Sequence, residues 1–367
     1  MGVKLQELVI KSKIDFSQLK GKIIAIDAPN IIFQLFNFAF KSKDSMKSNL
    51  MTDRTQRVIS HLYGILYRIN FYYSKSIFPI FCFDGRDSEL KRIITKDQLN
   101  DFRFTQKMYE SAIRAGQRYM ARQIAMGKEF LWPNIILESK SLLGALGVPY
   151  IESPASAESQ CAHLVKKRIV DYSNSQDFDS LLFGCPFTIQ NLSKSLRRKQ
   201  QGRWTYTKIE PMMINLQDNL KRLRINQFQL VDLAILIGTD YFQGIKGIGP
   251  KTALELIKKH HSIESIISHE GKKFNFNKLS HGLIQKIRKI FLLPEVLENE
   301  GVHGLLNWNP PNNVGVIELL CEDHNLNKER VQNNLDKLMD SYQKCRSFFK
   351  SNLKNPTIIQ KSLDMFS

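Results

Sequence analysis

The sequence predicts an α/β fold in which a mostly parallel central sheet is flanked by helices. Two apolar runs, Lys22–Ala28 and Ile77–Asp84, are rich in strand-forming residues, and each carries an acid near its end. Between them, Asn30–Phe40 and Thr55–Tyr73 carry apolar residues at helical spacing. The order strand, helix, helix, strand is typical of an α/β sheet, and open parallel sheets place their ligands at the carboxyl ends of the strands.

The middle of the chain predicts a helical arch followed by two further strands. Ser88–Leu131 is polar, rich in Arg and Lys and poor in strand formers, which favours either a solvent-facing helical excursion or an arch that orders on its substrate. A third strand is expected at Pro149–Glu152, then a helix over Ala155–Val170, then a fourth strand just before Asp177. The basic stretch Ser193–Arg203 contains a glycine and predicts a loop or hairpin turn.

The charge of the chain indicates a polyanionic partner. Its 53 Lys and Arg residues outnumber its 35 Asp and Glu residues, which gives a net charge of +18 and a pI near 9.6. Nucleic acid is the commonest partner of such a chain. Charge alone does not exclude a chain that is merely lysine-rich.

Composition argues against a secreted or membrane protein. The N-terminus has no uninterrupted apolar stretch, and no run reaches the roughly 18 apolar residues of a membrane span. The five cysteines are odd in number and contain no CxxC pair, which disfavours a zinc site or a disulfide framework. We therefore expect an intracellular protein without a membrane partner.

Six acids at the expected ends of elements form the most informative pattern. Carboxylate oxygens suit Mg²⁺ or Mn²⁺, and carboxylates gathered in one site repel one another unless cations share them. Two such ions about 4 Å apart can activate a water and stabilise the leaving oxygen of a phosphodiester. A single acid is as readily a helix cap or a surface charge. The six are Asp27, Asp84, Glu158, Asp177, Asp179 and Asp240.

Two of these acids, Asp177 and Asp179, lie two residues apart in a segment that we expect to be extended. Alternate residues of an extended segment point to the same face. One short segment would then supply two ligands to the same site.

A glycine-rich turn, GIKGIGP, spans Gly244–Pro250 and precedes a helical run. Glycines such as Gly247 and Gly249 let backbone amides approach phosphates closely, and a helix N-terminus favours anions. With Lys251, the turn predicts a sequence-independent grip on a nucleic-acid backbone. The plain alternative is a structural turn between two helices.

Several runs together resemble the flap endonucleases, which are structure-specific 5′ nucleases. They are AIDAPNIIFQ, SHLYGILYR, FCFDGRDSELK, GVPYIESPASAESQCAHL, SQDFDSLLFGCP and LIGTDYFQGIKGIGPKTALELI, in the family's order and approximate spacing. The resemblance covers nearly the whole chain and is closer to archaeal members. It implies a Mg²⁺-dependent hydrolase with 5′ flap endonuclease and 5′-3′ exonuclease activity on branched DNA, acting in DNA repair and in replication through Okazaki fragment maturation.

The resemblance also implies a two-metal site with two Mg²⁺ ions, or Mn²⁺ in their place. Asp84 and Glu158 would hold one ion, Asp177, Asp179 and Asp240 the second, and Asp27 would act through water. The family normally has an acid where this chain has Ser156. A serine can orient a metal-bound water but brings no charge, so a non-catalytic DNA-junction binder is the alternative. An RNA nuclease is disfavoured by the glycine turn.

Further DNA contacts follow from the same resemblance. Lys91 would steer the scissile phosphate, with Arg92 beside it, although both also fit a solvated helix face. A second family arginine falls on Gln98, so that Lys96 or Arg103 would substitute. The glycine turn resembles the family's helix-two-turn-helix, which holds duplex DNA with the help of a K⁺ ion.

Three more positions match the family. Phe33 falls where the family has an aromatic residue that stacks on a base, although core packing is the alternative. Arg68 falls at a family position near the DNA backbone, and Gly2 falls at a terminus that lies near the site. In the last residues, Gln360, Leu363 and Phe366 match the spacing of a sliding-clamp-binding peptide, in which Ser367 replaces the usual second aromatic.

We expect four parts along the chain: an N-terminal nuclease region at residues 1–105, the remainder of the arch and an internal nuclease region at 106–225, a helical DNA-binding region at 226–355, and a clamp-binding tail at 356–367. The archaeal resemblance favours a cytoplasmic location, and a eukaryotic member would be nuclear.

Overall fold

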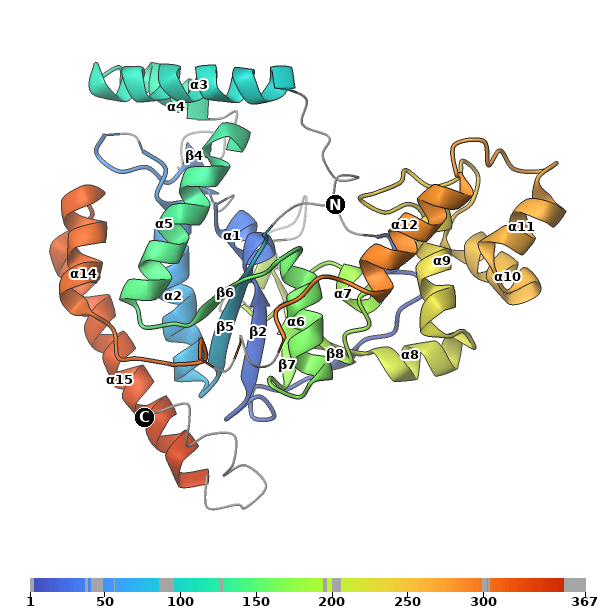
Figure 1. Ribbon diagram of the computed structural model, residues 1–367. Helices are drawn as coiled ribbons and strands as arrows, with labels where there is room; N and C mark the ends of the chain where they lie inside the picture. The colour runs from blue at the N-terminus through green and yellow to red at the C-terminus, as the bar shows by residue number, and fades with distance from the viewer. Residues whose placement is uncertain are drawn as a thin grey trace. The chain divides into compact units, whose positions relative to one another are not determined.

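The computed structural model describes residues 3–36, 39–40, 49–55, 57–85, 96–125, 128–193, 197–199, 206–298, 302 and 304–352 (Figure 1). Among these residues, none of the helices combines the length and apolar character that a membrane crossing requires. The chain divides into two compact units. The first holds residues 1–27, 82–91 and 152–301, and the second holds 28–81, 92–151 and 302–367.

A seven-stranded mixed sheet has the strand order β1-β11-β8-β7-β2-β5-β6. In chain order the strands are β1 (Ser12–Lys13), β2 (Ile23–Asp27), β5 (Phe78–Phe83), β6 (Tyr150–Glu152), β7 (Tyr172–Asn174), β8 (Phe187–Gln190) and β11 (Met212–Asn215). Strand β7 pairs in parallel with β2 and with β8, whereas β11 is antiparallel to both β8 and β1. The predicted α/β fold is confirmed, with antiparallel strands at one edge.

The parallel strands place their carboxyl ends together. Ile26 is opposite Asn174 across β2 and β7, and Asn174 is opposite Ile189 across β7 and β8. All five residues of β2 are buried, as expected for a parallel strand covered on both faces. We call the side at which β2, β7 and β8 end the carboxyl edge.

The first unit carries most of the shorter helices: α6 (Ala157–Lys166), α7 (Asp179–Leu182), α8 (Leu216–Leu223), α9 (Gln227–Ile237), α10 (Pro250–His260), α11 (Ile263–Glu270) and α12 (His281–Leu292). Helix α9 begins with a capping box between Asn226 and Gln229. A buried network joins three of these helices, because the Arg288 guanidinium binds the Asp232 carboxylate at 2.7 Å and that of Glu264 at 2.6 Å.

The second unit contains α1 (Ala28–Phe36), α2 (Ser60–Ser74), α3 (Lys96–Arg114), α4 (Arg118–Ala125), the 3₁₀ helix η1 (Lys128–Leu131), α5 (Trp132–Ala145), α14 (Asn313–Ile317), the π-helix η2 (Glu318–Asp323) and α15 (Lys328–Asn352). Strands β3 (Ala39–Phe40) and β4 (Asn49–Leu50) form a separate pair. The aromatic core of the second unit includes Tyr73, which lies edge-on to Phe78 and Tyr342. It also includes Trp308, whose indole N–H donates to the Pro79 carbonyl.

The predicted helical character of Ser88–Leu131 holds for the described part, residues 96–125 and 128–131. Its role as an arch over the substrate stays a prediction. In the first unit, Arg197–Lys199 forms β9, which pairs with β10 (Tyr206–Lys208) as a two-stranded ribbon, in agreement with the expected hairpin.

Candidate active site

A serine that the sequence did not single out joins two of the predicted acids. Asp27 is the last residue of β2 and is buried. The Ser175 hydroxyl, just beyond β7, lies 2.8 Å from Asp27 Oδ2 and 3.1 Å from Glu158 Oε1. Because a hydroxyl has one proton for these two acceptors, Ser175 cannot fully satisfy both carboxylates at once.

Glu158 lies in the first turn of α6, and its carboxylate is surrounded by other acids. Burial raises the pKa of Glu158 well above its usual value, and the charges of Asp27, Asp179 and Asp177 raise it further. The Ser175 hydroxyl opposes this shift. Burial and the neighbouring acids therefore make the ionised form of Glu158 costly.

Ser156, where the family has an acid, is the N-cap of α6. Its hydroxyl accepts from the Ser159 amide at 3.1 Å, and Ser159 donates in return to the Ser156 carbonyl at 2.7 Å. Serine is a favourable N-cap because its oxygen accepts one of the amide protons left free at the helix start. At this position the serine stabilises the helix that carries Glu158.

Asp84 follows β5 and caps the same helix from a second segment. Its Oδ1 accepts from the Ala157 amide, the first in α6, at 2.8 Å. The next residue, Gly85, donates its amide to the Ala155 carbonyl at 2.7 Å, and a Cβ on Gly85 would meet the Ser153 carbonyl oxygen at 1.8 Å. Only glycine permits this close crossing, which holds Asp84 beside the start of α6.

The segment that carries Asp177 and Asp179 is not extended, so that prediction is wrong. Phe178 has helical backbone angles, and Asp179 begins α7. The Asp179 carboxylate accepts from the Val3 amide at 2.7 Å. Burial raises the pKa of Asp179 to about 6, the Val3 amide lowers it, and the charges of Asp240 and Asp177 raise it. A turn rather than a strand brings these two acids near each other.

Asp240 lies in a tight turn between two glycines, Gly238 and Gly244, the second of which begins the predicted glycine-rich turn. Thr239 and Phe242 exchange backbone hydrogen bonds of 2.8 and 3.2 Å around the pair Asp240 and Tyr241. At the base of this turn, Gly244 has a φ of +81°, and a Cβ there would meet the Ile237 carbonyl oxygen at 2.2 Å. Gly238 has a φ of +122°, and a Cβ there would meet the Gln243 carbonyl oxygen at 2.9 Å.

The donor chemistry fits divalent cations. As placed, the described residues contain no set of three His, Cys, Asp or Glu side chains arranged around a common metal position. Asp27, Glu158, Asp177, Asp179 and Asp240 nonetheless act on one another electrostatically within the first unit. Such carboxylates, with oxygen donors only, match the preferences of Mg²⁺ and Mn²⁺.

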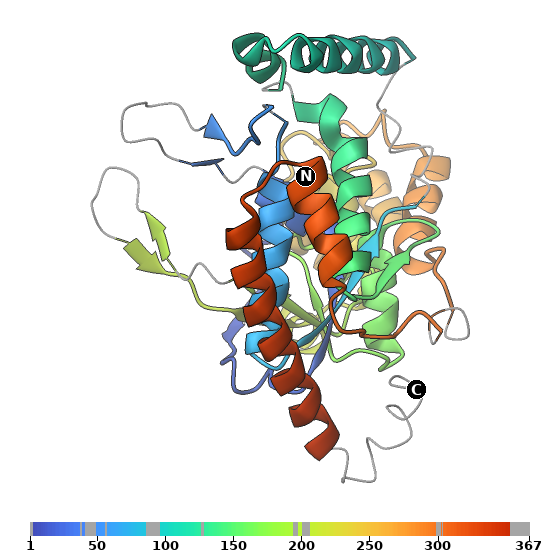
Figure 2. The same ribbon diagram turned by 90° about the vertical axis from the view of Figure 1, so that its left-hand side faces the viewer.

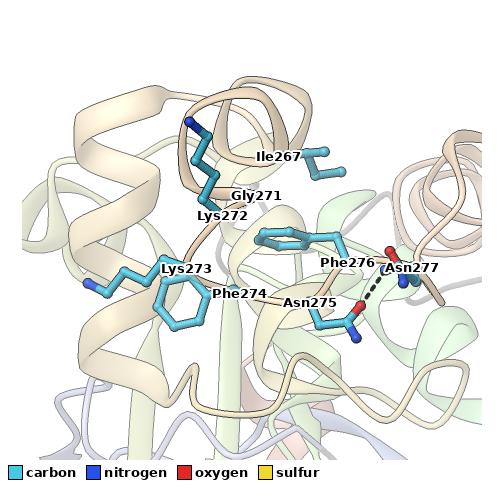
Figure 3. A pocket seen from close by; sticks show the side chains of 8 residues that line it. All are labelled: Ile267, Gly271, Lys272, Lys273, Phe274, Asn275, Phe276 and Asn277. Carbon is cyan, nitrogen blue, oxygen red and sulfur yellow. Dashed lines mark hydrogen bonds between the residues drawn. The ribbon is translucent and has the colours of Figure 1, made fainter.

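The glycine turn leads into α10 in the same unit. Gly247 has a φ of +89°, and its missing Cβ would lie 3.8 Å from the ring of Phe274. Phe274 lines a hollow of about 530 Å³ together with Lys272, Lys273 and their neighbours (Figure 3). Gly249 is the N-cap of α10, and a Cβ on it would meet no atom within 4 Å. The fold therefore requires a positive φ at Gly247 but does not require glycine at Gly249.

The other DNA-binding positions that the resemblance implies differ in how exposed they are. Lys251 is 79% exposed at the start of α10, with its ammonium 4.0 Å from Glu7. In the second unit, Phe33 is 58% exposed and lies edge-on to Trp132, so core packing does not explain it. Arg68 is buried in α2 beside Tyr72. Burial raises the pKa of Tyr72, and the charge of Arg68 lowers it.

Several predicted positions lie outside the described residues. These are Gly2, Lys91, Arg92 and the tail residues Gln360, Leu363 and Phe366. Arg103, one of the two residues expected to substitute for the family's second arginine, is exposed on α3. The sequence analysis did not single out Ser175, Val3, Gly85 and Gly238, whose importance comes from contacts made in the fold. A serine two residues before Asp177 and the glycines flanking Asp84 and Asp240 were the available signals.

Family models and known relatives match this chain over most of its length, and they agree on one family. The XPG N-terminal domain matches residues 1–100, and the XPG I-region matches residues 147–240. Flap endonuclease 1 of Methanosarcina acetivorans is 36% identical over 92% of this chain and 96% of its own length, and that of Caldivirga maquilingensis is 37% identical over 94% and 97%.

Solved structures agree with this assignment. The flap endonuclease-1 of Methanococcus jannaschii matches 93% of this chain and 99% of its own, at a TM-score of 0.70 and 28% identity. The Holliday junction-resolving enzyme GEN1, solved with product DNA, Mg²⁺ and Mn²⁺ ions, shares the fold at a TM-score of 0.58 and 16% identity. The chain belongs to the flap endonuclease family of structure-specific nucleases, hydrolases of DNA repair and replication.

Proposed function

We propose that this protein cuts branched DNA at 5′ flaps by a two-metal mechanism, with 5′-3′ exonuclease action as a lesser activity, in Okazaki fragment maturation and repair. The observation that carries the proposal is the group of mutually repelling carboxylates around Glu158 and Asp179 in the first unit. Buried carboxylates with raised pKa values destabilise a fold unless a cation binds them. A functional demand for metal explains why they are there.

The resemblance to the flap endonucleases supports the roles that we give the acids. We assign Asp84 and Glu158 to one ion, Asp177, Asp179 and Asp240 to the other, and Asp27 to a water-mediated contact. The ions, when bound, supply an activated water and neutralise the leaving oxygen. Ser175 orients the Asp27 and Glu158 carboxylates, and the Val3 amide orients that of Asp179. Lys91, with Arg92, steers the scissile phosphate.

Cleavage of a labelled duplex with a 5′ flap tests this proposal. Purified protein with Mg²⁺ is expected to release the flap, to leave a 3′-hydroxyl on the flap and a 5′-phosphate on the duplex, and to act weakly on single strands and blunt duplexes. EDTA is expected to abolish cutting. Tight flap binding without cutting in either Mg²⁺ or Mn²⁺ would instead establish the DNA-junction binder.

The role of Ser156 is resolved by two substitutions. Ser156→Asp retains an N-cap and adds the charge that the family carries there, so we expect tighter Mg²⁺ binding and cleavage at least as fast as in the parent. Ser156→Ala removes the cap and is expected to lower the free energy of unfolding by ~1 kcal/mol. Chemical denaturation and Mg²⁺ titrations of cleavage measure both effects. Slower cutting by the aspartate variant would show that this chain depends on the serine.

We further propose that Gly247, Gly249 and Lys251 hold duplex DNA through its backbone, with K⁺ at the turn. The open space at Gly249 supports this, since no protein atom explains the missing side chain. Gly249→Asn supplies a good N-cap, so stability is expected to stay equal or to rise slightly. Duplex affinity is expected to fall roughly tenfold because the side chain occupies the phosphate's approach. Fluorescence anisotropy with a duplex measures it, and unchanged affinity would place the grip elsewhere.

Three broader assignments complete the proposal. Phe33 supports an unpaired base beside the cut, Arg68 and Gly2 lie near the DNA, and the tail residues Gln360, Leu363 and Phe366 bind a sliding clamp. The four-part division of the chain stays a prediction, as does its location in an archaeal-type cytoplasm or a nucleus. Loss of clamp binding on deletion of residues 356–367, measured by calorimetry, tests the tail.

A further inference from the structure

The loop between α11 and α12 forms a hollow to which the proposed function assigns no role. The loop spans residues 271–280 and is drawn in orange (Figure 1 and Figure 2). Ile267 and residues 271–277 line the hollow, whose volume of about 530 Å³ is in the range of small-ligand sites (Figure 3). We propose that this hollow binds one nucleotide through both its base and its phosphate. The nucleotide is either a free mononucleotide or an unpaired nucleotide of a DNA strand.

Two phenylalanines give the hollow an aromatic wall. The rings of Phe274 and Phe276 lie edge-to-face, with their centroids 6.4 Å apart. Phe276 is buried and holds the loop to the protein, whereas Phe274 is half-buried and keeps part of its ring accessible. An accessible aromatic ring is a surface on which any nucleobase can stack, because every base has a π-face.

Two lysines of the same loop supply positive charge beside this wall. Lys272 and Lys273 are exposed and both line the hollow (Figure 3). The Lys273 ammonium lies 5.2 Å from the centroid of the Phe274 ring. Lysine binds phosphate as a compact point charge. A base stacked on Phe274 would therefore carry its phosphate within reach of Lys273.

The acid nearest to these lysines in the sequence is already paired. Glu270 ends α11, and its Oε1 lies 3.0 Å from His260 Nε2 and 3.1 Å from Lys259 Nζ, both on α10. Hydrogen bonds from His260 and Lys259 lower the pKa of Glu270, so it stays ionised and engaged with α10. The sequence then contains no further acid before Glu295. The loop itself thus offers its lysines no negative partner, which favours an anionic ligand.

The backbone of the loop is ordered without a ligand. The amides of Lys273 and Phe274 both donate to the Glu270 carbonyl, at 2.9 and 3.0 Å. Asn275 Oδ1 accepts from the Asn277 amide at 2.9 Å, the dashed line in Figure 3. Both asparagines line the hollow, and a side-chain amide has the donor and acceptor groups that match the edge of a base. A site ordered in advance loses less entropy on binding.

The hollow adjoins the glycine turn without duplicating it. The position of a Cβ on Gly247 would lie 3.8 Å from the Phe274 ring. A contact to the backbone of duplex DNA would need only the lysines. The accessible ring of Phe274 and the two asparagine amides instead suit a base that is not paired, and this favours a nucleotide over a plain phosphate.

Calorimetry in EDTA tests the hollow with three probes: deoxyadenosine monophosphate, deoxyadenosine and inorganic phosphate. We expect the full chain to bind the monophosphate at least ~10-fold more tightly than either fragment. Phe274→Leu is expected to weaken the monophosphate by ~10-fold or more, whereas Phe274→Tyr keeps an aromatic face and is expected to bind as the parent does. Lys273→Gln is expected to weaken the monophosphate and to leave deoxyadenosine unchanged. It supplies the test if melting shows that Phe274→Leu does not fold.

Anisotropy in EDTA with a gapped and a blunt duplex distinguishes the two sources. Weaker binding of the gapped duplex alone by Phe274→Leu assigns the hollow to an unpaired nucleotide of DNA, and weaker binding of the monophosphate alone assigns it to a free mononucleotide. Lys221→Gln, an exposed change on α8 in the same unit, is the matched control and is expected to alter neither.

Two results overturn the nucleotide site. One is that Phe274→Leu binds the monophosphate and the gapped duplex as the parent does. The other is that inorganic phosphate binds the parent as tightly as the monophosphate, which reduces the hollow to a phosphate site. If the parent still cuts flaps with Mg²⁺, either result leaves the proposed function standing, and a parent that binds the nucleotide but cuts no flap overturns the proposed function alone.

Discussion

Replacing Asp179 with asparagine is expected to reduce flap cleavage by ~10³-fold or more while leaving DNA binding within a few-fold of the parent. The substitution removes one charge from the carboxylates assigned to metal. Asparagine keeps an oxygen that can accept the Val3 amide, so the backbone around α7 is retained. Single-turnover cleavage with Mg²⁺, beside anisotropy in EDTA, separates the two effects. A variant that still cuts at the parent rate would remove Asp179 from the site.

The same substitution is expected to stabilise the metal-free protein at neutral and higher pH. The folded-state pKa of Asp179 is about 6, above the ordinary value of 3.8. The folded state therefore holds the proton more tightly, and its stability declines as pH rises from the unfolded value through about 6. Two pKa units correspond to roughly 3 kcal/mol as an upper order of magnitude. Asparagine does not ionise, so its advantage over the parent is expected to grow over that pH range and then level off.

Thermal melts at several pH values, with and without Mg²⁺, check this expectation without any measurement of cutting. Mg²⁺ is expected to raise the melting temperature of the parent more than that of Asp179→Asn, because binding to the folded state stabilises it. Asp340→Asn, an exposed change on α15, is the matched control and is expected to shift neither curve. Equal responses to Mg²⁺ in parent and variant would contradict a metal role for Asp179.

The sequence alone predicted those helices and strands whose hydrophobic pattern lies within a short segment. The β-branched run of β2 and the apolar run of β5 predicted both strands, and with them Asp27 and Asp84 at their ends. Helical periodicity predicted α1, α2 and α6. These patterns depend on neighbours within a few residues, which a single sequence displays directly.

Other features depend on contacts between distant segments. The antiparallel pairing of β1 with β11 joins Ser12 to Met213, and no local pattern specifies such a partner. The extended conformation that we expected for residues 177–179 is wrong because Asp179 begins a helix, and its carboxylate accepts from the Val3 amide, far away in sequence. The Ser175 hydroxyl belongs to the site through its distance to Glu158, which only the fold reveals.

Replacing Gly244 with alanine is expected to cause a large loss of stability. A Cβ there would lie 2.2 Å from the Ile237 carbonyl oxygen, and the backbone has a φ of +81°. The positive φ costs about 1 kcal/mol, and the clash requires backbone movement, so a loss of more than about 3 kcal/mol is expected. Because Gly244 closes the turn that carries Asp240, cleavage is also expected to fall by roughly 10² even in molecules that remain folded.

Gly282→Ala is the matched control in the same unit. Gly282 lies in the first turn of α12, where a Cβ would meet no atom within 4 Å. Alanine is favoured over glycine in a helix by about 0.5–1 kcal/mol, so this variant is expected to be slightly more stable than the parent and to cut normally. Urea denaturation measures both variants, and the cleavage rate below the unfolding midpoint of each separates displacement of Asp240 from global unfolding. If Gly244→Ala matches Gly282→Ala in stability and rate, the close approach of Gly244 to Ile237 does not position Asp240, and its placement must depend on the Thr239–Phe242 pairing alone.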